Sequence, residues 1–192
     1  MVVSRGPLPR TTALRNVLVC ASRTVRLLLR RQTHLRRDLV GRRMRFADGT
    51  SAEVFRETTA DGADSDDPCL LFVEFRLRLL RGRWHKLFLW ECILNTPLFV
   101  GFPGFTSKLW LNVDQEDRYR GFYEWSDPRS AERYARSLWR VLELVCEPGS
   151  IDYAIVPGLR RAEVFDDPML LAPFDLSGSA WWRFVGAAPV SS

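Results

Sequence analysis

The chain has 192 residues, of which 46% are hydrophobic and 27% are charged, and its formal net charge is +5. These fractions are typical of a globular protein, and no apolar run reaches the roughly 18 residues that a membrane-spanning helix needs, which argues against an integral membrane protein. The length is sufficient for one hydrophobic core with appended segments.

The four cysteines lie far apart, and the chain has only two histidines. Because no C-x-x-C pair is present, the sequence predicts no zinc site or other metal site. Reduced thiols and a cytoplasmic location are expected. Cys92 and Cys146 fall within helical patterns and are predicted to be small core residues, with a reactive thiol as the alternative.

Residues 1–41 are predicted to form a basic amphipathic segment. Residues 1–37 contain nine arginines and no acidic residue, whereas the remainder has 19 basic and 23 acidic residues. Apolar residues recur at helical spacing from Pro9 to Arg37, which predicts one amphipathic helix. The basic character belongs to this segment, and we infer no nucleic-acid binding from it.

Four interpretations of this helix remain open. It packs on the core through its leucines and leaves the arginines solvated, or residues 9–37 make a peripheral contact with an anionic membrane or other anionic partner. An acid-free, arginine-rich start is also typical of a mitochondrial transit peptide. Disorder is the fourth interpretation.

A β-hairpin is predicted over residues 42–58. Ala47-Asp48-Gly49 forms a three-residue turn with Gly49 in the left-handed conformation. This turn places Met44 opposite Ala52 and Arg43 opposite Glu53. Residues 59–68 are acidic and rich in turn formers, so they are predicted to form an exposed loop.

Residues 69–164 show the element order β-α-β-β-α-β. The α+β fold that this order predicts is a ferredoxin-like sandwich, which often pairs across its open sheet face as a dimeric α/β barrel. Asp127 is predicted to cap the second helix, with Pro128 at its first position. The expected elements are a central strand at 69–80, a helix at 84–96, strands at 105–113 and 118–125, a helix that begins after residue 127, and a strand at 151–156.

Two of these strands alternate cleanly in side-chain character. In the first, Phe105, Ser107, Leu109, Leu111 and Val113 share one face, and Thr106, Lys108, Trp110 and Asn112 share the other. In the second, one side carries Tyr119, Gly121, Tyr123 and Trp125. We therefore expect a surface rich in tryptophan and tyrosine that turns toward a second copy of the chain.

A family resemblance follows from motifs in this region. They are Asn95-Thr96-Pro97, Gly101-Phe102-Pro103-Gly104-Phe105, Lys108-Leu109-Trp110-Leu111 and Tyr119-Arg120-Gly121-Phe122-Tyr123-Glu124-Trp125, followed by the capped helix. With them the chain resembles uncharacterised actinobacterial proteins related to the YdhR-like and antibiotic biosynthesis monooxygenase branch of the dimeric α/β-barrel superfamily. The resemblance implies a homodimer with a pocket between the sheet and the helices of each subunit. Some relatives oxidise aromatic polyketides without a cofactor, and the resemblance implies such an activity here. Others cleave haem with a histidine on the second helix, and this chain has no histidine at that place.

The candidate site follows from what such a pocket needs, namely apolar walls, a few convergent polar groups and a base or hydrogen-bond donor near a phenol. The candidate catalytic residues are His85, Tyr119 and Tyr123. The candidate substrate-binding residues are Asn95, Lys108, Trp110, Asn112 and Trp125. In the structural alternative the aromatic residues form the core of a dimer interface, Lys108 is solvated, and His85 and Asn95 cap a helix.

Residues 165–192 form a tail of loop-like composition that contains Trp181 and Trp182. These indoles are expected to dock on the core, on the partner subunit or on the N-terminal helix. The first hypothesis for function is a homodimer that binds a small aromatic or polyketide-like molecule and oxidises it without a cofactor. The alternative is a non-catalytic interaction module whose basic helix contacts an anionic partner or membrane.

Overall fold

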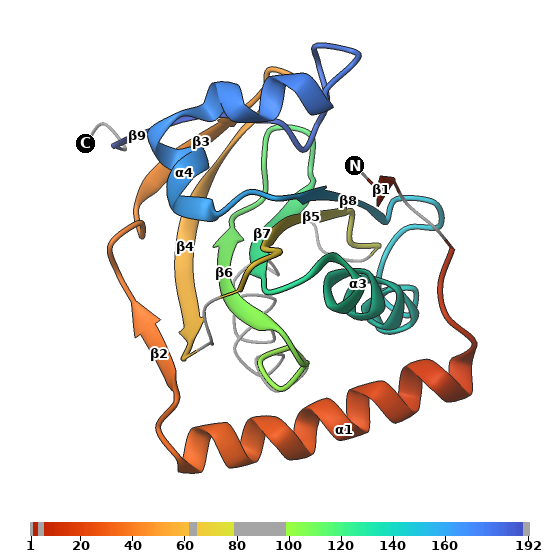
Figure 1. Ribbon diagram of the computed structural model, residues 1–192. Coiled ribbons are helices and arrows are strands. Elements are labelled where there is room, and N and C mark those ends of the chain that lie inside the picture. Colours follow the sequence, from red (N-terminus) through yellow and green to blue (C-terminus); the bar gives the residue numbers. More distant parts are fainter. Residues whose placement is uncertain (1, 4–5, 62–64, 79–98, 190–192) are drawn as a thin grey trace.

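The computed structural model describes residues 2–3, 6–61, 65–78 and 99–189 (Figure 1). The helices in this part are α1 (Arg10–Leu29), α3 (Pro128–Leu142), α4 (Arg161–Asp166) and the 3₁₀ helix η3 (Pro168–Phe174). The strands are β1 (Val2–Val3), β2 (Thr33–Arg36), β3 (Arg42–Phe46), β4 (Ser51–Ala60), β5 (Cys69–Phe75), β6 (Phe105–Leu111), β7 (Tyr119–Trp125), β8 (Asp152–Pro157) and β9 (Phe184–Pro189).

The described strands form one curled antiparallel sheet in the order β1-β8-β5-β7-β6-β4-β3-β9, and β2 pairs with β4. Its centre, β8-β5-β7-β6, has the strand order of a ferredoxin-like sheet. The mixed α+β architecture is therefore consistent with the predicted ferredoxin-like fold. The helix predicted at 84–96 lies outside the described residues.

Strand β5 is central, as predicted, because it pairs with β7 on one side and β8 on the other. Its successive side chains enter different cores. Leu71 and Val73 join one cluster, whereas Leu70 and Phe72 join the other. A strand that is apolar on both faces is stable only when both faces are covered. The strand ends at Phe75, earlier than the predicted Leu80.

Helix α3 begins where the sequence predicts it. The Asp127 carboxylate accepts a hydrogen bond of 2.8 Å from the backbone N–H of Ser130, and Pro128 occupies the first turn. Burial raises the pKa of Asp127, but its hydrogen bonds, chiefly from Ser130, outweigh this effect and lower the pKa below its usual value. The cap therefore carries a charge that complements the helix N-terminus at neutral pH.

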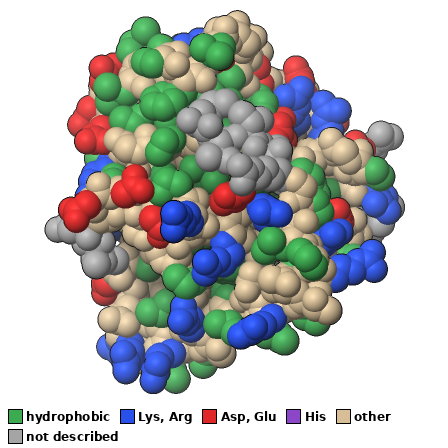
Figure 2. Space-filling view, turned by 45° about the vertical axis from the view of Figure 1, so that its right-hand side comes forward, with side chains coloured by type: hydrophobic (Ala, Val, Ile, Leu, Met, Phe, Trp, Pro, Cys, Tyr) green, Lys and Arg blue, Asp and Glu red, His purple; other side chains and the backbone are tan. Residues whose placement is uncertain are grey.

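The N-terminal segment departs from the single helix predicted from Pro9 to Arg37. Helix α1 ends at Leu29, and residues 33–36 form β2 on the edge of β4. The face that α1 turns inward consists of Ala13, Cys20 and Thr24. The interpretation that this helix packs on the core is confirmed, but the contact is made by these small residues and Leu27, whereas the other leucines of α1 lie on the outside. Figure 2 shows Lys and Arg side chains interspersed with hydrophobic ones across the lower half of the molecule.

The alternation predicted for the strand at 105–113 holds over residues 107–111 but fails at both ends, since Val113 packs against the core that contains Trp110 and not with Leu109 and Leu111. Leu109 and Leu111 face one core, and Trp110 faces the other. Phe105 lies on the same side as Trp110, not with the leucines as predicted, because the register with β7 shifts between Phe105 and Ser107. Such a bulge inserts one residue and moves the preceding side chain to the opposite face.

The C-terminal tail docks on the core of its own chain. The side chain of Trp182 is buried, and its ring centroid lies 5.9 Å from that of Phe72 on β5. Strand β9 pairs with β3, and Phe165 stacks between Phe122 and Phe184. The tail elements thus cover the sheet face that lies opposite α3 (Figure 1).

Both faces of the sheet are therefore covered by the chain itself. Tyr119, Tyr123 and Trp125 lie in the core on the side of α3 rather than on a surface turned toward a second copy, which corrects the prediction. The tail fills the face through which a dimeric α/β barrel would pair. The sheet-to-sheet pairing that the resemblance implies would need this covered face, and the homodimer stays a prediction.

Candidate functional site

The structure brings together three of the predicted site residues, Lys108, Trp110 and Tyr123. The Lys108 Nζ atom lies 3.0 Å from the ring centroid of Trp110, 4.7 Å from that of Tyr123 and 4.5 Å from that of Phe99. The Lys108 side chain is buried, so the alternative of a solvated lysine is wrong. The three rings offer their electron-rich faces to the ammonium group.

A pair of tyrosines completes this aromatic cluster. The Tyr134 hydroxyl donates a hydrogen bond of 3.1 Å to the Tyr123 hydroxyl, and Trp125 packs on the Tyr134 ring at 4.9 Å. Burial raises the pKa of Tyr134 well above its usual value of 10, and the neighbouring Tyr123 adds to this effect. A phenol of this kind stays protonated at neutral pH, so it is a hydrogen-bond donor rather than a base.

Except for Trp125, which packs on Tyr134, the other predicted site residues lie apart from this cluster or outside the described part of the chain. The Tyr119 ring stacks on Phe75 with centroids 5.8 Å apart. Asn112 is half-buried, and its backbone N–H donates to the Glu53 carbonyl at 2.8 Å. His85 and Asn95 lie outside the described residues. The cavities that the described residues line are found elsewhere.

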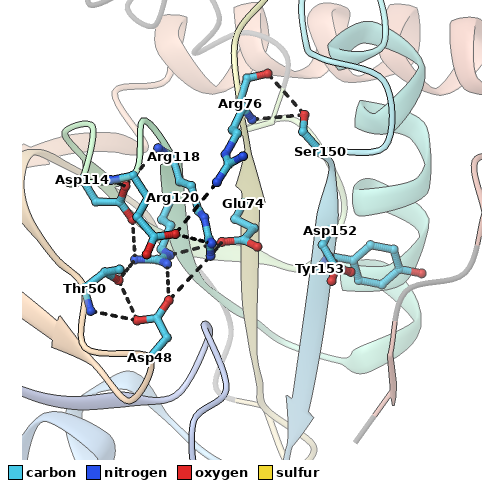
Figure 3. Close-up of polar contacts among 11 residues, drawn as sticks. Asp48, Thr50, Glu74, Arg76, Asp114, Arg118, Arg120, Ser150, Asp152 and Tyr153 are labelled. Carbon is cyan, nitrogen blue, oxygen red and sulfur yellow. Dashed lines mark hydrogen bonds and ion pairs between the residues drawn. The ribbon is translucent and has the colours of Figure 1, made fainter.

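A network around Arg120 is the most densely charged part of the described molecule (Figure 3). Arg120 is buried and pairs with Asp48 at 2.8 Å and with Asp114 at 3.0 Å. Glu74 lies 3.5 Å from the same guanidinium, and burial raises its pKa even though Arg120 and Arg118 oppose the shift. These contacts join the hairpin turn to β5 and β7, so the network is structural.

A different polar cluster lies on the sheet face that the tail covers. Strand pairing places His34, Thr59, Ser107 and Glu124 directly opposite one another across β2, β4, β6 and β7. Two residues further along β6 the same face is apolar, since Leu109 and Phe122 belong to the tail-side core. The apolar core therefore ends in a polar row at this edge.

Glu57 of β4 and Arg161 of α4 meet at the border of this row. Arg161 Nη2 donates a hydrogen bond of 2.7 Å to Glu57 Oε1, and the Arg161 backbone N–H donates to Glu124 Oε2 at 3.2 Å. Only 2% of Glu57 and 3% of Ser107 are exposed to solvent. Among the described residues, no hydrogen-bond partner exists for Glu57 Oε2, Ser107 Oγ or Arg161 Nη1.

These groups line a cavity of about 510 Å³, which we call the Glu57 trough. Its lining includes Glu57, Ser107, Glu124 and Arg161, with Leu39 and Phe165 as apolar walls and the His34–Asp61 pair, 2.9 Å apart, at the rim. A second cavity of about 670 Å³ shares Ala60, Asp61 and Thr106 with it and continues toward α1. Both volumes are in the range of small-molecule sites.

The sequence prediction did not include the trough residues. It placed Ser107 on the same face as two leucines, and a serine among leucines is a signal of a polar interruption in a core face. Glu57 lies in the predicted hairpin and Arg161 at the end of the predicted core region, and neither position indicates a role in a site. Only the register between β4, β6 and β7 brings these side chains together.

Comparison with solved structures gives a match to a ferredoxin-fold protein. No protein-family model and no curated protein matches the chain. The chain is similar to an uncharacterized ferredoxin-fold protein from Listeria monocytogenes, described as related to antibiotic biosynthesis monooxygenases, with 14% identity and a TM-score of 0.43. The match covers 58% of this chain and 66% of the Listeria protein. The narrower assignment to YdhR-like actinobacterial proteins stays a prediction.

Proposed function

We propose that this chain is a ferredoxin-like protein that binds a small polar molecule in the Glu57 trough. The observation that carries the proposal is the buried Glu57 carboxylate, which uses one oxygen on Arg161 and has no described partner for the other. A buried polar atom without a partner costs the folded state about 1–3 kcal/mol. A ligand that donates a hydrogen bond to this oxygen removes that cost, and this gain strengthens the binding of the ligand.

The unpartnered atoms define the class of ligand. Glu57 Oε2 accepts a hydrogen bond, and Arg161 Nη1 of the same ion pair donates one. A molecule with an N–H donor beside a carbonyl acceptor, such as a primary carboxamide, is complementary to both. Five acidic residues and three arginines line the trough, so an anion is disfavoured, and an ammonium cation has no acceptor to offer Arg161 Nη1.

An aromatic ligand, which the sequence predicts, is supported by Leu39 and Phe165 at the trough wall. Oxidation of such a ligand stays a separate prediction. The residues assigned to it, Tyr119 and Tyr123, are packed in the core on the other face of the sheet, and His85 lies outside the described residues. The proposal for the trough therefore concerns binding alone.

The test uses three probes that differ in hydrogen-bonding groups, namely benzamide, benzoate and benzylammonium, in saturation-transfer NMR. Benzamide has both a donor and an acceptor, whereas each of the others has one. We expect benzamide to bind at least tenfold more tightly than the other two. Glu57→Gln replaces one carboxylate oxygen with an NH2 group, which donates and does not accept. The variant is therefore expected to weaken benzamide binding about tenfold or more.

Glu143→Gln on the exposed end of α3 is the matched control, because it removes the same charge outside the trough. It is expected to bind benzamide like the wild type. The free energy of unfolding separates the proposal from a purely structural ion pair. If Glu57→Gln destabilises the protein by several kcal/mol and leaves probe binding unchanged, or if the three probes bind equally, the trough is not a carboxamide site.

A further inference from the structure

Helix α1 presents an apolar stripe to solvent. Its large apolar side chains are mostly exposed: 62% of Leu18 and 81% of Leu29 are accessible. We define the leucine stripe as Leu14, Leu18, Val25, Leu28 and Leu29, which all have exposed side chains. Their spacing of three, four and seven residues places them on one side of the helix. A row of this length on an exposed helix indicates an interaction surface.

The inward face of α1 explains why the leucines are outside. Ala13, Cys20 and Thr24 are small, and they allow the helix backbone to approach the chain at Gly101. A Cβ atom built on Gly101 would lie only 2.0 Å from the Cys20 carbonyl oxygen. Rotating the helix to bury the stripe would break this close contact. The orientation of α1 is therefore fixed by the small residues.

Basic side chains flank the leucine stripe. Arg15 and Arg26 are exposed on α1 in the sector next to the stripe, and Arg23 on α1 and Arg30 directly after it are exposed further around the helix. No acidic residue occurs in residues 1–37. The helix therefore carries an apolar row and arginines without an acidic residue of its own along about 30 Å of its length, and Asp61 and Asp66 line a cavity together with Arg23 and Arg26.

The geometry points to an anionic phospholipid surface as the partner of this helix. Apolar side chains enter the headgroup and acyl boundary while arginines contact the phosphates, as in amphipathic helices that lie in the plane of a membrane. A second copy of the chain fits less well, because two α1 helices face to face would bring their arginines together. None of the helices in the described residues has the length and apolar character to span a bilayer. The contact is therefore peripheral.

The orientation of α1 in the molecule permits this contact. In Figure 1, α1 lies along the lower edge of the molecule, and the sheet and the other helices all lie above it. The leucine stripe can therefore reach a flat surface without unfolding of any described element. The Glu57 trough is formed by other side chains, so the two proposals are independent.

The experiment is co-sedimentation of the full chain with vesicles of phosphatidylcholine containing 30% phosphatidylglycerol, compared with pure phosphatidylcholine. The wild type is expected to bind the anionic vesicles at least tenfold more strongly. Leu18→Ser with Val25→Ser should abolish binding, and Arg15→Gln with Arg26→Gln should weaken it about tenfold or more. All four side chains are exposed, so circular dichroism should show unchanged folding.

Two control pairs match these changes elsewhere on the surface. Leu144→Ser with Leu176→Ser removes leucines that are more exposed than Leu18 and Val25, and Arg43→Gln with Arg45→Gln removes exposed arginines of β3. Both pairs are expected to bind like the wild type. Equal binding of the stripe variant and the wild type, equal binding to both kinds of vesicle, or no binding at all overturns the proposal. So does a dimer that the stripe variant dissociates while vesicle binding stays the same.

Discussion

Substitution of Gly101 by alanine tests whether α1 is held against the core as the structure shows. The new Cβ would lie 2.0 Å from the Cys20 carbonyl oxygen and 2.7 Å from the Thr24 backbone nitrogen. An ordinary contact of this kind is at least 3.4 Å. The helix or the chain at Gly101 must therefore move by about 1.4 Å, a displacement that overpacking of a rigid site requires.

The cost of that movement follows from what surrounds Gly101. Two of the three nearest atoms belong to the backbone of α1 and the third is the Thr24 hydroxyl, so no long side chain could give way. Overpacking typically costs 1–3 kcal/mol, and the upper end applies here. We expect Gly101→Ala to lower the free energy of unfolding by about 3 kcal/mol. With an m-value of about 2 kcal/mol/M, the urea midpoint falls by about 1.5 M.

Two measurements check this prediction. The first is urea unfolding followed by circular dichroism, with Gly6→Ala as the control because no atom lies within 4 Å of its added Cβ. The second is alkylation of Cys20, whose pKa burial raises to about 11, so that its thiol reacts slowly in the wild type. Faster labelling of Cys20 in Gly101→Ala is expected. A midpoint within 0.3 M of wild type, as an approximate margin, together with unchanged labelling would refute the seating of α1 on Gly101.

Two further predictions concern α3 and the tail. Asp127→Ala should lower the free energy of unfolding by about 1 kcal/mol, because the cap bond to Ser130 is lost. Asp127→Asn keeps a hydrogen-bond acceptor, so its loss of unfolding free energy relative to the wild type should reflect the missing charge. Because the folded pKa of Asp127 lies below its usual 3.8, this loss should be full above pH 4 and shrink as the pH falls through the folded pKa. Urea unfolding at pH 7 and pH 3 measures this change, and a deficit that grows on acidification contradicts the assignment. Trp182→Ala should cost about 3–5 kcal/mol, since the side chain is buried on Phe72; a thermal melt that matches wild type would show that the tail does not cover the sheet.

The hairpin and the cap of α3 were predictable because their chemistry is local. Gly49 adopts φ of 85°, the left-handed conformation that the three-residue turn requires. This turn fixes the register, and the predicted pairs of Met44 with Ala52 and Arg43 with Glu53 are confirmed. In both elements a few adjacent residues determine the geometry, so no information from distant parts of the chain is needed.

The orientation of α1 was not predictable from periodicity. A 3.6-residue pattern shows which side chains share a face, but not which face turns inward. The leucines predict an inward apolar face, yet the close approach at Gly101, more than 70 residues away, selects the face of Ala13, Cys20 and Thr24. The same limit applies to the tail, whose loop-like composition conceals that Trp182 and Phe184 cover the second face of the sheet.

The Glu57 trough shows how far strand alternation can be taken toward a site. Alternation alone predicts that Ser107 shares a strand face with Leu109. It also predicts that Glu124 lies on the other face of its strand from Tyr123. A candidate site also needs the register, because a shift of one residue between β6 and β7 would bring Ser107 beside a tyrosine instead of Glu124. The bulge after Phe105 sits next to this pair, and no single residue in the sequence marks it. Arg161 then reaches Glu57 from a helix that the tail positions by long-range packing. The polar row therefore depends on three strand pairings, those of β2 with β4, β4 with β6 and β6 with β7. Each residue of the row, considered alone, fits the alternation of an ordinary strand.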